Sequence, residues 1–170
     1  GLRQLCDERK MLLVFDEVQT GPARMGTWFG YQHFGVEPDI LTSAKAIAGG
    51  MPLGVLMARP EVAKSLVPGT HASTFGGNAI GCAAGIAAFQ AIAEEKMLEN
   101  VQRLGPMIET RLKSMAKKTG GVKEVRRAGF MIGIELETAG ADLVTACREK
   151  GLLINCTHDT VLRLLPAFNV

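Results

Sequence analysis

The feature that most constrains the fold of this 170-residue chain is a continuous apolar run at residues 11–15, which leads directly into Asp16 and Glu17. An apolar run without alternating polar residues is typical of a strand that is buried on both faces of a parallel sheet. Further candidate strands follow at residues 39–43 and 53–58. Because these segments are short and separated by glycines, they favour an α/β fold, a mainly parallel sheet with helices packed on it.

Turn and capping residues indicate where the other elements lie. Asn78 is a suitable N-cap, and Pro106 predicts a kink or a break in a long helix. Helices are predicted at residues 2–9, 60–66, 79–93, 98–118 and 141–150. Further strands are predicted at residues 122–127, 130–136, 152–155 and 161–165.

These predicted elements fall into two groups. Residues 1–95 are expected to form the C-terminal part of a larger α/β domain, and residues 96–170 an incomplete small α+β domain. The first predicted helix begins at once, and the last predicted strand ends close to residue 170. We therefore expect the chain to be part of a longer protein.

The composition argues against several classes of partner. The net charge is only +2, which gives no reason to expect nucleic acid, and the basic residues between 113 and 127 are interpreted as a solvated helix face. No apolar run approaches the roughly 18 residues of a membrane span. The four cysteines form no C-x-x-C pair and the three histidines share no spacing, so no metal site is expected. We interpret the cysteines as reduced thiols of a cytoplasmic protein.

Asp16 and Lys45 are the residues that most strongly indicate chemistry. Asp16 closes the first predicted strand, and ligands of open α/β sheets bind outside the carboxyl ends of the strands. Lys45 follows the next predicted strand among small residues, which we expect to desolvate its amine and favour the nucleophilic form. An amine near a buried carboxylate suits an aldehyde cofactor with a ring nitrogen, because the amine captures the aldehyde while the carboxylate holds the nitrogen protonated.

Three further side chains are candidates for the same ligand. Gln19 follows Asp16 closely, and Ser73 and Thr74 precede the helix capped by Asn78, where hydroxyls and free N–H groups favour a phosphate. Each candidate also has a plainer interpretation: Asp16 as the cap of a turn, Gln19 as a solvated amide, and the Ser-Thr pair as part of an ordinary capped turn. An apolar strand that ends in Asp-Glu also resembles the magnesium-binding strand of an ATPase, but the chain contains no G-x-x-x-x-G-K-[ST] loop.

Several motifs occur together and in order. They are Asp16-Glu17-Val18-Gln19-Thr20-Gly21, Glu37-Pro38-Asp39-Ile40, Ala44-Lys45, Gly49-Gly50, Pro52-Leu53-Gly54 and His71-Ala72-Ser73-Thr74-Phe75-Gly76-Gly77-Asn78. Over nearly the whole chain they resemble the class III aminotransferases, which are pyridoxal-phosphate enzymes of fold type I. The lead from Gly69-Thr70-His71 into Ser73-Thr74-Phe75 is most similar to the acetylornithine members of that class.

The resemblance implies a role for each candidate near the ring of pyridoxal 5'-phosphate. Asp16 would pair with the pyridinium nitrogen, Val18 would pack on a ring face, and Gln19 would hydrogen-bond the phenolic oxygen. Lys45 would bind the cofactor aldehyde covalently and move the proton between substrate and cofactor. Arg163 would pair with a substrate carboxylate or with a glutamate.

The resemblance also implies partners and a reaction. Thr74, with Ser73, would bind the phosphate of the cofactor in the other subunit, which implies a homodimer with shared active sites. The implied reaction transfers the ω-amino group of N-acetylornithine to 2-oxoglutarate. Two alternatives stay open: another ω-aminotransferase of the class, acting on ornithine, 4-aminobutyrate or diaminopelargonate, and a chain that is catalytically incomplete by itself. Ala23 stands where the family commonly has glycine.

Overall fold

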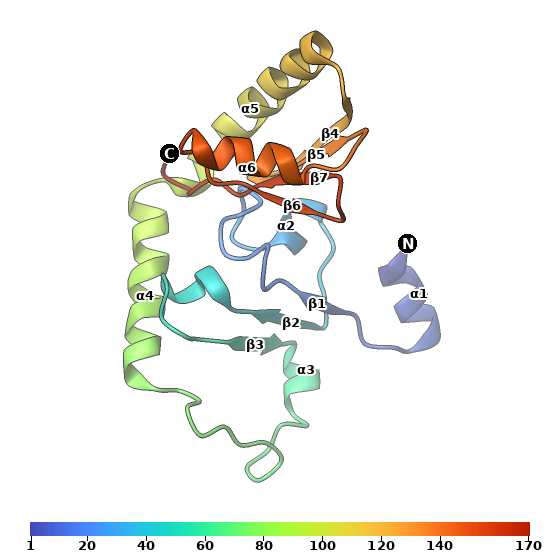
Figure 1. Ribbon diagram of the computed structural model, residues 1–170. Coiled ribbons are helices and arrows are strands. Elements are labelled where there is room, and N and C mark those ends of the chain that lie inside the picture. Colours follow the sequence, from blue (N-terminus) through green and yellow to red (C-terminus); the bar gives the residue numbers. More distant parts are fainter.

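A three-stranded sheet occupies the first part of the chain. The computed structural model describes all 170 residues. β1 (Val14–Asp16) pairs in parallel with β2 (Ile40–Ser43), which pairs in antiparallel fashion with β3 (Val55–Ala58). Figure 1 shows these strands in the lower half of the molecule, with the 3-10 helix η1 (Lys45–Ala48) directly after β2. The first sheet is therefore mixed, with β1 and β2 as its parallel pair.

Helices flank this sheet and connect it to the second half of the chain. α1 (Leu2–Arg9) precedes β1, α2 (Gly30–Phe34) follows a glycine-containing loop, and α3 (Pro60–Ala63) follows β3. α4 (Ala79–Glu94) contacts η1 and leads toward the upper part of Figure 1. The Asn78 side chain caps α4 by accepting a hydrogen bond from the Gly81 N–H at 2.7 Å, which confirms the predicted cap.

A second sheet, wholly antiparallel, occupies the rest of the chain. Helix α5 (Met97–Thr119) precedes it in the chain, and α6 (Ala141–Glu149) lies between β5 and β6 in the sequence. The strand order is β4-β5-β7-β6, from β4 (Val122–Ala128), β5 (Met131–Leu136), β6 (Asn155–Thr157) and β7 (Val161–Leu164). Its core consists of Val125, Ile134, Leu136 and Leu162, against which partly buried side chains of α5 and α6 pack.

The β4–β5 hairpin tip joins the two halves of the molecule. Gly129 has φ +56°, a left-handed conformation that favours glycine, and a Cβ at this position would lie 2.2 Å from the Arg24 carbonyl oxygen. The next N–H, that of the fully buried Phe130, donates to the same carbonyl at 2.8 Å. The loop that follows β1 is thereby held against the second sheet.

The structure corrects several predicted elements in the first half of the chain. Leu12 and Val14 are 56% and 52% exposed, so the apolar run is not buried on both faces. The reason is that no helix packs closely on β1 to cover the second face. The helix predicted for residues 60–66 ends at Ala63, since the N–H groups of Ser65 and Leu66 bond three residues back, as in a turn.

The second half needs two corrections. A kink or a break was predicted near Pro106; the break is wrong, because α5 is continuous through that residue, and the kink stays a prediction. The strand predicted for residues 152–155 begins only at Asn155, because the Leu152 N–H closes the end of α6 on the Cys147 carbonyl and is not free for a sheet. The predicted division at residue 95 falls in the turn between α4 and α5, and it stays a prediction. No helix of the protein is both long and apolar enough to cross a lipid bilayer.

Candidate active site

The carboxyl ends of β1 and β2 bring Asp16 and Lys45 to the same edge of the first sheet. Asp16 is paired with Thr42 in the parallel ladder, and the Glu17 N–H donates to the Thr42 carbonyl at 2.8 Å. Lys45 follows β2 by two residues and opens η1 with φ +51°, in the left-handed region that side chains other than glycine seldom adopt. Backbone strain of this kind is concentrated at functional sites.

The Asp16 carboxylate is oriented by two donors on one of its oxygens. Asp16 Oδ1 accepts hydrogen bonds from the Val18 N–H at 3.1 Å and from the Thr42 hydroxyl at 3.2 Å. No group of the chain donates to Oδ2. The carboxylate is therefore held in place while one of its oxygens stays available to a ligand.

Four of the predicted site residues meet in one hollow. A cavity of about 170 Å³ is lined by Val18, Gln19, Lys45 and Arg163, with Gly21, Pro22, Arg24, Ala46, Leu165 and Phe168. These residues come from the end of β1, the start of η1 and the end of β7. The cavity thus collects residues that are up to 150 positions apart in the sequence (Val18 to Phe168) into one place.

A second hollow lies on the other side of Lys45. It measures about 680 Å³ and includes Lys45, Ser73 and Asn78 among its lining residues, together with the glycine-rich segments at 50–54 and 76–77. Thr74 does not line it, and Asp16 lines neither hollow. The structure therefore places Ser73, but not Thr74, beside Lys45 of the same chain.

Two expectations about solvent are wrong. Lys45 and Asp16 are both exposed, whereas the sequence analysis expected a desolvated amine near a buried carboxylate. The physical reason is that Lys45 stands between two open hollows, and that Asp16 lies at the open edge of the sheet. The small residues around Lys45 give space and do not cover the amine.

Glu17 holds the loop next to the site, a role that the sequence motifs do not indicate. Its carboxylate is buried and accepts hydrogen bonds from the Thr20 hydroxyl at 2.9 Å, the Tyr31 N–H at 2.8 Å and the Gly30 N–H. Glu17 thereby ties the loop after Gln19 to the start of α2. Strand alternation was the available signal, because Asp16 and Glu17 must point to opposite faces.

Ala23 lies in this loop, at a position where the resemblance implies glycine. It is fully buried and has φ +67°, so the loop keeps a left-handed residue at this position. The loop is further fixed by the buried Ser43 hydroxyl, which donates to the Gly21 carbonyl at 3.1 Å. The loop therefore holds a residue with a side chain in a left-handed conformation that favours glycine.

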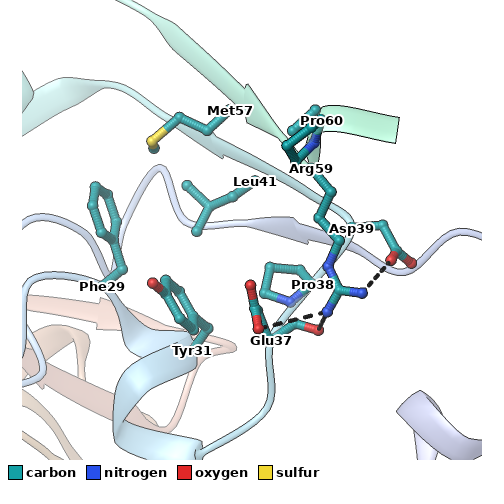
Figure 2. A pocket seen from close by; sticks show the side chains of 10 residues that line it. Phe29, Tyr31, Glu37, Pro38, Asp39, Leu41, Met57, Arg59 and Pro60 are labelled. Atoms are coloured by element: carbon teal, nitrogen blue, oxygen red, sulfur yellow. Dashed lines mark hydrogen bonds and ion pairs between the residues drawn. The ribbon is translucent and has the colours of Figure 1, made fainter. Parts of the chain in front are cut away.

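A third hollow lies at the opposite edge of the sheet and contains none of the predicted site residues. Figure 2 shows this space of about 280 Å³, lined by side chains that include Phe29, Tyr31 and Met57. At its rim the Arg59 guanidinium lies 3.5 Å from Asp39 and 3.7 Å from Glu37. Because ligands bind at carboxyl ends of strands and Asp39 precedes β2, we assign this hollow a structural role.

Asp39 is the centre of that structural cluster. The Leu13 N–H at 2.7 Å and the Arg3 guanidinium at 2.8 Å hold the pKa of the Asp39 carboxyl below its usual range. Both donors favour the charged form of the carboxyl group. Asp39 thus connects α1, the segment before β1 and the start of β2.

Comparison with known proteins decides which family has this arrangement. The model of the family described as "Aminotransferase class-III" matches residues 1–170. The chain belongs to the class-III aminotransferases. Acetylornithine aminotransferase of Methanocaldococcus jannaschii is 48% identical to this class-III chain over 166 residues, which are 98% of the chain and 42% of that relative.

Solved structures of class-III aminotransferases have the same fold. Ornithine delta-aminotransferase of Plasmodium falciparum matches with a TM-score of 0.93 and 34% identity over 100% of this chain and 45% of its own. Acetylornithine aminotransferase of Elizabethkingia anophelis matches with a TM-score of 0.92 and 35% identity. This match covers 98% of the present chain and 45% of the Elizabethkingia chain. The expected family and α/β fold are confirmed, and the chain spans less than half the length of these relatives.

Proposed function

We propose that this chain contributes the catalytic lysine and part of the cofactor site to a pyridoxal-phosphate aminotransferase. The observation that carries the proposal is the meeting of Val18, Gln19, Lys45 and Arg163 in one hollow. The Asp16 carboxylate, two residues before Val18, has one oxygen to which no group of the chain donates. Membership of the class-III family supports the same chemistry. The amino donor is N-acetylornithine and the acceptor is 2-oxoglutarate.

The residues present suit pyridoxal phosphate. The group carries an aldehyde, a flat aromatic ring with a nitrogen and a phenolic oxygen, and a phosphate. Lys45 offers an amine, Val18 an apolar contact for the ring, and Gln19 an amide for the phenolic oxygen, all on one hollow. Asp16 Oδ2 is left for the ring nitrogen, and Ser73 lies before the N-terminus of α4, where phosphates bind well.

Each side chain then has a chemical task. Pyridoxal phosphate, when bound, supplies an electron sink for negative charge that develops on the substrate carbon. Asp16 Oδ2 keeps the ring nitrogen protonated, because a carboxylate favours a cation beside it. Lys45 Nζ holds the cofactor and later carries a proton as general acid and base. Arg163 binds a substrate carboxylate through its planar guanidinium.

The choice of N-acetylornithine rests on the sequence relatives. Acetylornithine aminotransferases of M. jannaschii and Methanosarcina mazei share 48% and 50% identity with the chain. Among the solved structures, the acetylornithine and ornithine enzymes match almost equally, at 35% and 34% identity. Ornithine, 4-aminobutyrate and diaminopelargonate are the alternative donors. Initial rates of the active protein with these four donors test the choice, and a preference of at least tenfold in kcat/KM for N-acetylornithine is expected. An equal or higher value for ornithine would make the ornithine assignment the correct one.

The protein is further proposed to act as a homodimer in the cytoplasm. Thr74 is exposed and does not line the hollow beside its own Lys45, which supports its use by the cofactor of a second subunit. Phe75, which follows Thr74, and Ile80, in the first turn of α4, are 81% and 70% exposed apolar side chains that a partner would cover. The four cysteines are free thiols, which supports a reducing compartment.

The alternative of a catalytically incomplete chain is tested by colour. Pyridoxal phosphate is added to the 170-residue chain, and visible absorbance is recorded before and after gel filtration. A bound yellow band shows that these residues suffice to hold the cofactor. A colourless chain, when a longer form of the protein is yellow, shows that the site needs further residues.

A further inference from the structure

Arg24 reaches from the loop after β1 to the segment after β7. Its guanidinium donates a hydrogen bond to the Pro166 carbonyl at 2.6 Å and lies 4.4 Å from the ring centroid of Phe168. The two segments are 142 residues apart in the sequence. This side chain therefore joins the part that carries Lys45 to the part that carries Arg163.

The loop does not need the Arg24 side chain to keep its shape. Main-chain groups of the loop are held by other residues: the Gly21 carbonyl by Ser43, the Arg24 carbonyl by the Phe130 N–H, and the Gly26 carbonyl by Gln102 at 2.6 Å. The side chain of Arg24 is directed to Pro166 and Phe168. Its structural effect consequently falls on the segment that follows Arg163.

Arg24 also lines the same hollow as Lys45 and Arg163. The ten lining residues include three cationic side chains and no carboxylate. No acidic group of the chain forms an ion pair with Arg24 either, since its partners are a carbonyl oxygen and an aromatic ring. A guanidinium that is partly desolvated and lacks an anion attracts one, and burial lowers the pKa of Arg24 in agreement with this.

We propose that Arg24 is a positioning residue for the carboxylate end of this hollow. By holding Pro166 and Phe168 it fixes the segment that leaves β7 just after Arg163 and closes this end of the hollow, and its charge adds to the attraction for a carboxylate substrate. The inference rests on the proposed transamination and adds a residue to the recognition of the dicarboxylate 2-oxo acid. Planar Arg suits this task, because the same group stacks on a ring and donates to a carbonyl.

The test compares four variants of the cofactor-loaded protein. Arg24→Gln removes the charge, Arg24→Lys keeps the charge without the planar group, and Phe168→Leu removes the ring. Arg111→Gln, at an exposed residue of α5 for which no side-chain hydrogen bond or ion pair is found, is the matched control. The readouts are KM and kcat for 2-oxoglutarate, the Kd of glutarate (a dicarboxylate without a keto group), the Kd of the cofactor, and the unfolding temperature.

A positioning role should change the constants for dicarboxylate binding without changing kcat or cofactor affinity. In Arg24→Gln we expect KM and the glutarate Kd to rise about tenfold, while kcat and the cofactor Kd change less than twofold, because an interaction common to ground and transition states is lost. Arg24→Lys and Phe168→Leu are expected to raise both constants about threefold, and Arg111→Gln to leave them unchanged.

Two results would overturn the inference. One is an Arg24→Gln protein whose glutarate Kd stays within twofold of the wild type. The other is a parallel loss of kcat, cofactor affinity and stability without a separate effect on the dicarboxylate, which would mark a purely structural role. If Arg24→Gln does not fold, Phe168→Leu and Arg24→Lys decide by the same criteria. Failure of the proposed function is distinguishable, because the wild type itself would then show no transamination.

Discussion

The Thr42 hydroxyl donates a hydrogen bond to Asp16 Oδ1 over 3.2 Å, and the two residues are direct partners in the parallel β1–β2 ladder. The register of the sheet therefore determines the orientation of the carboxylate. The Val18 N–H donates to the same oxygen at 3.1 Å, so that Oδ2 has no donor from the chain and, in the proposed site, remains for the ring nitrogen of the cofactor. A hydroxyl on a neighbouring strand thus belongs to the site although it touches no ligand.

Removal of the Thr42 hydroxyl is expected to weaken cofactor binding. Thr42→Val keeps the branched shape and loses one hydrogen bond of about 1 kcal/mol, so the Kd of pyridoxal phosphate should rise about fivefold. Thr42→Ser keeps the hydroxyl and should stay within twofold of the wild type. Absorbance titration with the cofactor measures both. Equal effects in the two variants would show that the hydroxyl has no orienting role.

Glu17 is expected to contribute to stability more than to chemistry. Glu17→Ala leaves the Gly30 and Tyr31 N–H groups without their acceptor in a buried place and should lower the free energy of unfolding by about 2–4 kcal/mol. Glu8→Ala, at an exposed position of α1, should change it by less than about 0.5 kcal/mol. Urea unfolding measures both values, and a Glu17→Ala protein as stable as the Glu8→Ala protein would contradict the anchoring role.

Protonation of Asp39 is expected to lower the free energy of unfolding in acid. Its pKa is lower in the folded protein than in the unfolded chain, so its stabilising contribution is present above the unfolded value of about 4 and is lost as the pH falls through the folded value. Asp39→Asn should reduce stability near neutral pH and flatten the decline between about pH 5 and pH 2. Asp142→Asn, at an exposed position of α6, serves as control and should leave the slope unchanged. Identical slopes for Asp39→Asn and the wild type would refute this assignment.

If each active site takes Lys45 from one subunit and Thr74 from the other, two inactive or weakened variants should restore activity when they are mixed. Lys45→Ala should be inactive, and Thr74→Val should bind the cofactor about tenfold more weakly through loss of a hydrogen bond to a charged phosphate. When the two proteins are mixed and allowed to exchange subunits, half of the dimers are mixed and about a quarter of all sites regain both residues. Activity at limiting cofactor should recover accordingly. A mixture no more active than the separate proteins would show that Thr74 serves its own subunit or no cofactor.

The sequence predicted elements well where local signals agree. α1 was predicted at its observed bounds, and α4 begins after its Asn78 cap, because capping chemistry and periodicity act within a few residues. The strand at β6 was placed three residues early, since the use of the Leu152 N–H depends on how α6 ends. Local patterns do not record which backbone groups remain free after a helix closes.

For the candidate site too, residues that belong to sequence motifs were predicted, whereas features that depend on long-range structure were not. Val18, Gln19, Lys45 and Arg163 were all named from motifs, and the structure brings them into one hollow. The exposure of Lys45 could not be read from its small neighbours, because small residues fit both a tight packing and an open space. Thr42 and Arg24 were missed because their partners, Asp16 and Phe168, are set by strand register and by long-range packing.

The central claim is that Lys45 holds the cofactor, and covalent labelling tests it most directly. The protein is loaded with pyridoxal phosphate, reduced with borohydride, digested and analysed by mass spectrometry, alongside a Lys45→Ala protein treated in the same way. We expect the pyridoxyl group on the peptide that contains Lys45, and no stoichiometric label in the variant. Stoichiometric label on another lysine, or equal labelling of wild type and Lys45→Ala, would contradict the account.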